Sequence, residues 1–158
     1  MRSFRPRGAP QAGMTLLELV MACAILMVLA SAAVPLARMT VKRQRETELR
    51  RGLREIRTAI DRYKDAADRN QVRVEVGTEG YPPDLETLVK GVKVGPTGDR
   101  RLRFLRKIPV DPMTGRAEWG LRAIQDEPDS TSWGGKNVFD VYSRSTGTGL
   151  DGTRYSDW

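Results

Sequence analysis

The chain has 158 residues, a formal net charge of +7, one cysteine and no histidine. Without imidazole groups, histidine metal sites and histidine acid–base catalysis are excluded, and a lone cysteine cannot form a disulfide within the chain. Without residues 1–13 and the most apolar segment, residues 14–37, the chain keeps roughly 120 residues, enough for one small domain with a modest core.

A basic leader, residues 1–13, precedes a long apolar segment, residues 14–37, in which Glu18 is the only charged residue. As a helix rising 1.5 Å per residue, this segment would reach about 36 Å, enough to cross the ~30 Å hydrocarbon core of a bilayer. The leader arginines favour a cytoplasmic N-terminus. We therefore expect a retained membrane span, and the alternative is a secretory signal peptide cleaved near Ala32.

Glu18 lies about one helical turn into this apolar segment. A carboxylate near the centre of a bilayer costs about 2.5–3.5 kcal/mol on insertion scales, so an acid inside a span implies a partner. Cleavage after Gly13 would place the new ammonium group of Met14 one turn from Glu18. The two groups can then pair within one chain or between neighbouring chains, which predicts a device for assembling helices in a membrane.

Pro35 lies near the far end of the same segment. Proline removes one backbone donor and clashes with the preceding turn, which kinks a helix at a cost of about 3 kcal/mol. In a membrane, neighbouring helices and the Ser31 hydroxyl can satisfy the freed carbonyl groups. Pro35 is therefore either a simple kink or a position with a role in assembly.

The leader ending in Gly13, the string Thr15-Leu16-Leu17-Glu18 and Pro35 together resemble the type IV pilin-like family, whose members are processed by prepilin peptidase. The resemblance implies cleavage between Gly13 and Met14, with N-methylation of Met14. It also implies that Glu18 and Pro35 serve the assembly of processed chains into a helical filament.

A second helical pattern follows, from Thr40 to Asp68, with Gly52 as its only glycine and no proline. Apolar residues recur in it at spacings of four and three: Leu49, Leu53, Ile56, Ile60, Tyr63 and Ala67. The other faces are charged and include Arg50 and Arg57. This stripe predicts an amphipathic helix that packs on a domain, with a short coiled-coil seam as the alternative.

Short elements joined by turns are predicted after residue 80. Asp84 is a suitable N-cap for a helix at Leu85–Val89, and Gly91 ends that helix. The two prolines and the glycine within residues 108–115 predict a turn rather than a strand.

Two strands are predicted nearer the C-terminus, at residues 118–124 and 138–142, and the polar loop between them makes a long hairpin. The tail, residues 143–158, consists mostly of Gly, Ser, Thr and Asp. Its order therefore requires a staple that holds it to the domain.

Further motifs resemble the major pseudopilin of type II secretion systems: Tyr81-Pro82 followed by Leu85 and Leu88, Pro109-Val110-Asp111-Pro112, Phe139-Asp140-Val141-Tyr142-Ser143 and Asp151-Gly152. This resemblance implies an α+β fold in which a long N-terminal helix, half transmembrane and half amphipathic, packs on a small antiparallel sheet with a C-terminal loop. It implies a calcium ion in that loop. It also implies partners: minor pseudopilins, prepilin peptidase, an inner-membrane platform protein and an assembly ATPase.

Two carboxylates of the C-terminal loop, Asp151 and Asp157, are candidate calcium ligands. Calcium takes six to eight oxygen ligands from carboxylates, carbonyls and waters, so other oxygens of the loop would have to supplement them. Asp151-Gly152 is equally an ordinary turn sequence, and Arg144 and Arg154 would oppose a cation. A bound calcium ion would act as a staple, because binding to the folded site stabilises the folded chain.

A basic cluster at residues 100–107 contains five cations: Arg100, Arg101, Arg103, Arg106 and Lys107. Such a cluster can contact phosphates. Its only aromatic residue is Phe104, so the stacking platform of a single-strand binder is missing and we do not expect a nucleic-acid partner. We expect instead a solvated loop or a contact with acids of a neighbouring subunit, such as Asp126, Glu127 and Asp129.

These predictions combine into one organisation: a cleaved leader (1–13), a transmembrane and assembly helix (14–37) and a periplasmic domain (38–158), whose amphipathic helix ends at about residue 68. No catalytic residues are predicted. We expect a non-enzymatic subunit of a homo-oligomeric type II pseudopilus, which starts in the bacterial inner membrane and drives protein export across the outer membrane. A type IV pilus subunit, major or minor, a signal-anchored periplasmic binding module and a DNA-uptake pilin that uses the basic cluster stay open as alternatives.

Overall fold

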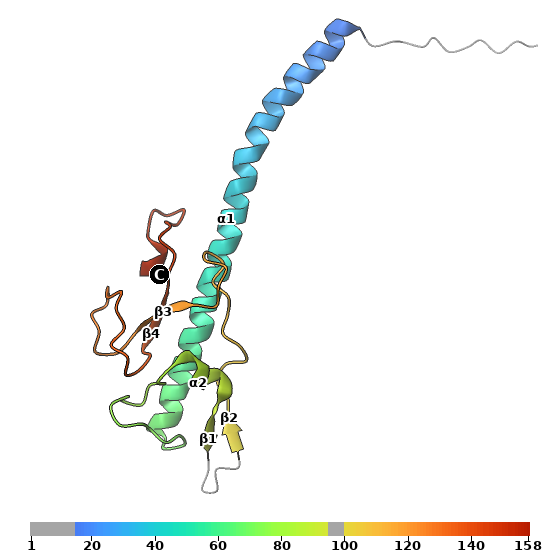
Figure 1. The fold of residues 1–158 in the computed structure, drawn as a ribbon. Helices are drawn as coiled ribbons and strands as arrows, with labels where there is room; N and C mark the ends of the chain where they lie inside the picture. Colours follow the sequence, from blue (N-terminus) through green and yellow to red (C-terminus); the bar gives the residue numbers. More distant parts are fainter. Residues whose placement is uncertain (1–14, 95–99) are drawn as a thin grey trace, which may run out of the picture. The chain divides into compact units, whose positions relative to one another are not determined.

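The computed structural model describes residues 15–94 and 100–158, with the side chains of residues 32–37 outside the description. Within these residues the fold is α+β, as predicted (Figure 1). Its elements are α1 (Leu16–Asp68), α2 (Leu85–Lys90), β1 (Val92–Val94), β2 (Arg100–Leu102), β3 (Trp119–Arg122), β4 (Asp140–Ser143) and a 3-10 helix, η1 (Tyr155–Asp157). The chain divides into two compact units, Met1–Thr40 and Val41–Trp158.

Helix α1 is assigned without a break from Leu16 to Asp68, which confirms the long helix expected from the sequence. It ends in a motif built around Asn70, whose φ is 55°. The Asn70 N–H donates to the carbonyl of Ala67 and the Gln71 N–H to that of Ala66, both at 2.9 Å. This pattern satisfies the last helical carbonyls, and asparagine tolerates the left-handed conformation that it needs.

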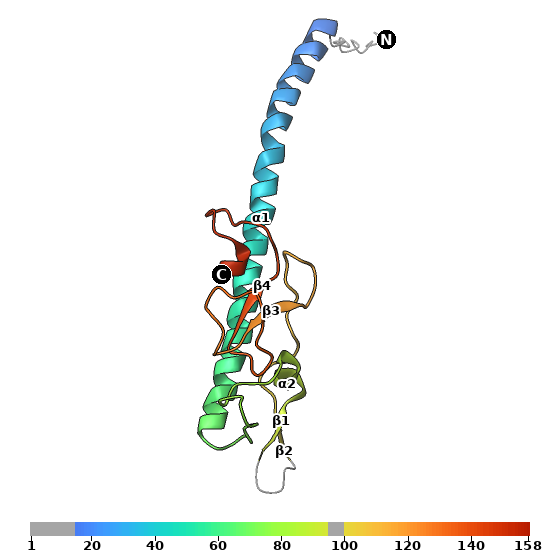
Figure 2. The same ribbon diagram turned by 60° about the vertical axis from the view of Figure 1, so that its left-hand side comes forward.

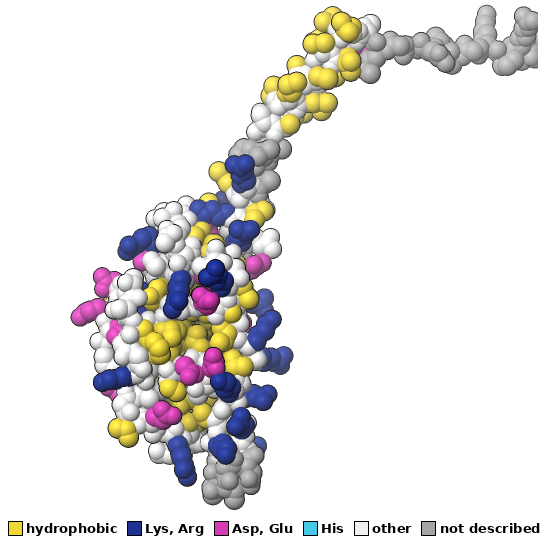
Figure 3. Space-filling model, viewed as in Figure 1, with side chains coloured by type: hydrophobic (Ala, Val, Ile, Leu, Met, Phe, Trp, Pro, Cys, Tyr) yellow, Lys and Arg dark blue, Asp and Glu magenta, His cyan; other side chains and the backbone are white. Residues whose placement is uncertain are grey.

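The first unit contains the apolar part of α1, and the side chains of its residues 15–31 are exposed on all sides of the helix. Leu16 is 81% exposed, Met27 72% and Leu29 62%. Figure 3 shows yellow, apolar side chains along the visible face of this part of the helix. Among the described residues, no helix is both long and apolar enough to cross a membrane.

The second unit builds its core on one stripe of α1. All six stripe residues predicted from the sequence are at most 5% exposed: Leu49, Leu53, Ile56, Ile60, Tyr63 and Ala67. Leu88 of α2, Val138 and Val141 are completely buried in the same cluster. The stripe is therefore the face of α1 that packs on its own domain, as predicted.

Two separate antiparallel pairs, rather than one sheet, make up the β-structure of the described residues. The predicted hairpin is confirmed as β3 paired with β4, in which Gly120 lies opposite Tyr142. A Cβ atom on Gly120 would lie 2.2 Å from the Tyr142 ring, so only glycine fits there. The pair β1–β2 corrects the loop expected at residues 100–107, because three-residue strands are too short to leave a periodic signal.

Figures 1 and 2 show α2, β1 and β2 beside the last turns of α1, and the β3–β4 hairpin with the C-terminal segment farther back along that helix. Helix α2 has the predicted cap, since the Asp84 carboxylate accepts from the Thr87 N–H at 2.6 Å and Gly91 ends it with a φ of 75°. The predicted turn at residues 108–115 is also present, held by the completely buried Asp111. Asp111 accepts from the Ser143 hydroxyl of β4 at 2.6 Å.

Candidate functional site

The start of α1 holds the residues predicted to govern processing and assembly. Thr15 is the residue before the helix, and its Oγ1 accepts from the Glu18 N–H at 3.2 Å. Its carbonyl accepts from the Leu19 N–H at 3.1 Å. A threonine followed three residues later by glutamate is a capping-box sequence, and Glu18 in the first turn also complements the positive helix N-terminus. Gly13 and Met14 lie outside the described residues.

The Glu18 side chain is exposed, and it forms no ion pair within the described part of the chain. It lies on a helix whose neighbouring side chains are apolar and exposed, among them Leu17 at 70% and Met21 at 59%. A carboxylate in such a position remains available to a cation from outside this segment. The assembly role of Pro35 stays a prediction, because its side chain lies outside the description.

The C-terminal tail, residues 143–158, is held by polar side chains on one face of α1, an arrangement that we call the C-terminal clasp. Its first member is Glu46, whose Oε1 accepts from the Leu150 N–H at 2.8 Å and from the Tyr155 hydroxyl at 3.1 Å. Tyr155 is 4% exposed. The clasp supplies the staple that the composition of the tail requires.

Arg57 is the most connected member of the clasp. Its Nε donates to Asp140 Oδ1 at 2.6 Å, and its Nη2 donates to Asp140 Oδ2 at 3.2 Å. The same Nη2 donates to the carbonyls of Val141 at 3.1 Å and of the terminal Trp158 at 2.8 Å. One guanidinium therefore joins α1 to β4 and to the end of the chain, through charge-assisted hydrogen bonds.

Arg50 is the third member of the clasp and lies between Glu46 and Arg57 along α1. Its Nη2 lies 3.3 Å from Asp151 Oδ2, and its guanidinium carbon lies 3.9 Å from the centroid of the Trp158 ring. The Trp158 ring also meets the Tyr155 ring edge-on at 5.0 Å. The cation–π contact of Arg50 with Trp158 and the edge-on contact of Tyr155 with Trp158 are both attractive. Together they hold the end of the chain against the helix.

The pKa of Tyr155 is raised to about 12, first by burial and then by its hydrogen bond to Glu46 and by the charge of that carboxylate. All three causes favour the neutral phenol. The Asp151 carboxyl has a lowered pKa because it accepts hydrogen bonds from Thr153 and lies beside Arg50. Asp157 has a lowered pKa because of hydrogen bonds from Ser156 and Arg154. The two aspartates are thus held as anions by partners of their own chain.

The structure places the two predicted calcium ligands, Asp151 and Asp157, on one open hollow of about 610 Å³. Four guanidinium groups line the same hollow: Arg50, Arg54, Arg57 and Arg154. In the described chain no three acidic, histidine or cysteine side chains are grouped to hold a metal ion. Two carboxylates among four arginines do not fit a calcium ion, which needs six to eight oxygens and an acidic site. Calcium therefore stays a prediction from the resemblance alone.

The clasp residues Glu46, Arg50 and Arg57 are absent from the predicted sites, because the sequence places them on charged outer faces of the helix. Their spacings of four and seven residues put them on one face of α1, and this is a signal that the sequence does carry. The capping box of Thr15 and Glu18 is a second signal of this kind, because its spacing marks a helix start.

Residues 9–34 match a protein-family model described as the prokaryotic N-terminal methylation motif. No curated protein and no solved structure matches the chain. The matched range contains Gly13, Met14, Thr15 and Glu18 and ends one residue before Pro35. This motif indicates a type IV pilin-like protein whose N-terminus is processed by prepilin peptidase.

Proposed function

We propose that this chain is a structural, non-enzymatic subunit of a type II secretion pseudopilus. The observation that carries the proposal is Glu18, an exposed carboxylate without a described ion-pair partner at the start of an apolar helix, inside the methylation motif. The narrower assignment to type II secretion rests on the C-terminal motifs that resemble the major pseudopilin.

In this proposal, residues 14–37 anchor the precursor in the bacterial inner membrane, with the leader in the cytoplasm and residues 38–158 in the periplasm. Prepilin peptidase cleaves between Gly13 and Met14, and the new N-terminus is methylated. The Glu18 carboxylate of an incoming subunit then pairs with the Met14 ammonium of a neighbour. An apolar environment strengthens this pairing, because an isolated charge there is costly.

The exposed apolar half of α1 supports this assignment. A helix that is hydrophobic on all sides requires an apolar environment, which a bilayer or the packed helices of neighbouring subunits supply. An assembly ATPase and a platform protein would add subunits to a rod capped by minor pseudopilins. The growing rod would push exported protein through the outer membrane.

Intact-mass measurement and N-terminal sequencing test the first step, on protein extracted from membranes of cells that contain prepilin peptidase. We expect a chain that begins at N-methylated Met14. A chain that keeps its leader, or is cut near Ala32, contradicts the proposal. Filaments that extend far outside the cell would instead identify a type IV pilus subunit.

The substitution Glu18→Ala tests the pairing. We expect the variant to insert in the membrane and to be processed as the wild type is, but to yield at least about tenfold fewer filaments, because each contact loses a desolvated ion pair. Glu18→Asp, which keeps the charge, is the matched control. Wild-type amounts of filament from Glu18→Ala contradict the pairing role.

A further inference from the structure

Three shallow hollows lie along one side of the second unit and meet one another, forming what we call the basic groove. Their volumes are about 620, 580 and 340 Å³. The first and third share Gln71 and Leu102, and the second and third share Arg62 and Phe104. The groove therefore runs continuously between α1 and the segment from β1 to Arg106.

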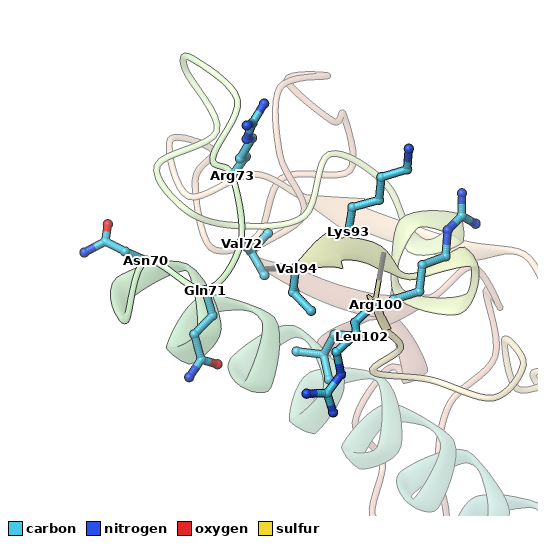
Figure 4. A pocket seen from close by; sticks show the side chains of 9 residues that line it. Asn70, Gln71, Val72, Arg73, Lys93, Val94, Arg100 and Leu102 are labelled. Atoms are coloured by element: carbon cyan, nitrogen blue, oxygen red, sulfur yellow. The ribbon is translucent and has the colours of Figure 1, made fainter. Parts of the chain in front are cut away.

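Cations dominate the lining of the groove. Helix α1 contributes Arg51, Arg54, Arg62 and Arg69, while Glu55 and Asp65 are its only lining acids in the described chain. The opposite wall carries Lys93, Arg101, Arg103 and Arg106, with Arg73 at the end beyond α1. Figure 4 shows Arg73 and Lys93 extending to the same side of the ribbon at that end.

None of these cations takes part in an ion pair within the described chain, where the six ion pairs involve other residues. Lys93 also lies directly opposite Arg101 in the antiparallel β1–β2 pair. Like charges opposite one another in a sheet destabilise it, so an anionic partner in the groove would relieve a cost that the isolated chain bears.

The loop between β3 and β4 carries the opposite charge, in Asp126, Glu127 and Asp129, and we call it the acidic loop. Glu127 and Asp129 are exposed and have no ion pair in the described chain. Asp126 Oδ2 accepts from the N–H groups of Ala123 at 2.7 Å and Gly134 at 3.1 Å. These bonds fix the base of the loop. The chain therefore loses little conformational entropy when the carboxylates of Glu127 and Asp129 bind a partner.

The groove and the loop lie on different edges of the second unit. In the common view of Figures 1 and 3, β2 lies to the right, where dark-blue side chains gather. The loop between β3 and β4 lies to the left, on the side where magenta side chains gather. Two grooves brought face to face would repel, and so would two acidic loops.

We propose that the basic groove of one copy of this chain receives the acidic loop of the next. Nearly all groove cations are arginines, whose planar forks bind carboxylates in a bidentate manner. Because each copy uses two different surfaces, the contact is heterologous, and repetition generates a ring or an open helical filament. The inference rests on the proposed filament function and names the contact between its periplasmic domains.

Charge reversal in the full-length chain tests this contact, in cells that supply prepilin peptidase and the assembly machinery. Arg103→Glu with Arg106→Glu, and separately Glu127→Lys with Asp129→Lys, should each lower filament yield at least about tenfold, because like charges then face one another. Combining all four changes restores opposite charges, and the yield should return to at least half of that of wild type. The matched control, Arg116→Glu with Arg144→Glu, alters exposed cations outside both the groove and the acidic loop and should assemble normally.

Failure of the four-residue combination to restore filaments, while wild type and control assemble, overturns the contact but leaves the filament function intact. Absence of wild-type filaments overturns both. Binding of a DNA duplex that is lost in Arg103→Glu with Arg106→Glu, with unchanged filament yield, overturns the contact in favour of a nucleic-acid surface.

Cysteine cross-linking provides a second measurement. With Cys23→Ser as background, Arg106→Cys and Glu127→Cys in one chain should give a ladder of covalent multimers under oxidising conditions. A disulfide forms only where the two Cβ atoms approach to about 4 Å, so the ladder reports contact between groove and loop. Products that stop at dimers, or no products from assembled filaments, overturn the heterologous contact.

Discussion

The two halves of α1 use the same kind of side chain in opposite ways. In the first unit, Leu26 and Val28 are 63% and 70% exposed, whereas Leu53 and Ile56 in the second unit are 2% and 0% exposed. The second half finds its apolar partners within its own chain. The first half has none among the described residues, and the proposed function assigns it a bilayer or other subunits as partners.

The polar residues of α1 differ in the same way. Arg57 in the second unit reaches Asp140 and two backbone carbonyls, whereas Glu18 in the first unit has no described ion pair. One half of the helix thus completes a domain, while the other half exposes the groups to which the proposed function assigns assembly. Four substitution experiments test this contrast between the two halves.

The largest difference should come from truncating one apolar side chain in each half. Ile56→Ala should lower the free energy of unfolding by about 2–5 kcal/mol, because it leaves a cavity in the core. Leu26→Ala should change it by less than about 0.5 kcal/mol, because the residue is exposed. Denaturant unfolding of the full chain in detergent, followed through the buried Trp119, measures both values. Equal losses would contradict the contrast between the halves.

The clasp should contribute a smaller amount. Arg57→Ala removes the bonds to Asp140, Val141 and Trp158, and should cost roughly 1–2 kcal/mol, since the partly exposed ion pair is screened by solvent. Arg54→Ala is the matched control, because Arg54 is exposed and has no described ion pair. The same unfolding measurement compares them. Similar midpoints for both variants would show that the clasp does not hold the tail.

Tyr155 should make the second unit sensitive to alkaline pH. The pKa of Tyr155 in the folded chain, about 12, exceeds the ordinary value of 10.0. The resulting contribution of Tyr155 to the free energy of unfolding is therefore fully present below pH 10. This contribution is lost as the pH rises from 10 to 12, because the Tyr155 phenol loses its proton at a lower pH in the unfolded chain than in the folded chain. Tyr155→Phe should flatten this part of the stability profile, while Tyr142→Phe should keep it. If the free energy of unfolding of Tyr155→Phe fell just as steeply between pH 10 and 12, Tyr155 would not be the cause of the alkaline sensitivity.

The smallest effect is expected at Asp151. Asp151→Ala removes contacts with Arg50 and Thr153 at an exposed site, so the melting midpoint should fall slightly. The fall should be equal in calcium and in a chelator, because the surrounding arginines do not fit a calcium site. If calcium instead raised the melting midpoint of the wild type but not that of Asp151→Ala, this result would show that calcium binds at Asp151.

Local patterns were sufficient for much of this fold. The spacing of Leu49, Leu53 and Ile56 identified the buried face of α1, and Asp84 and Gly91 marked the ends of α2. The β3–β4 hairpin followed from its two apolar runs. Each of these features depends on neighbours within a few residues, so the sequence displays it directly.

The clasp and the groove depend on contacts between distant residues. Arg57 meets Asp140 and Trp158, and Glu46 meets Leu150 and Tyr155, across about one hundred positions of the chain. Nothing in the spacing of the tail indicates which helical side chains it will contact, so the sequence did not identify Glu46, Arg50 and Arg57 as its partners. Local residue patterns were enough to identify the helix, its apolar half, the buried stripe of its amphipathic half and its N-terminal motif. Which charges form ion pairs within the described chain and which do not follows from its packing, which brings together residues far apart in the sequence.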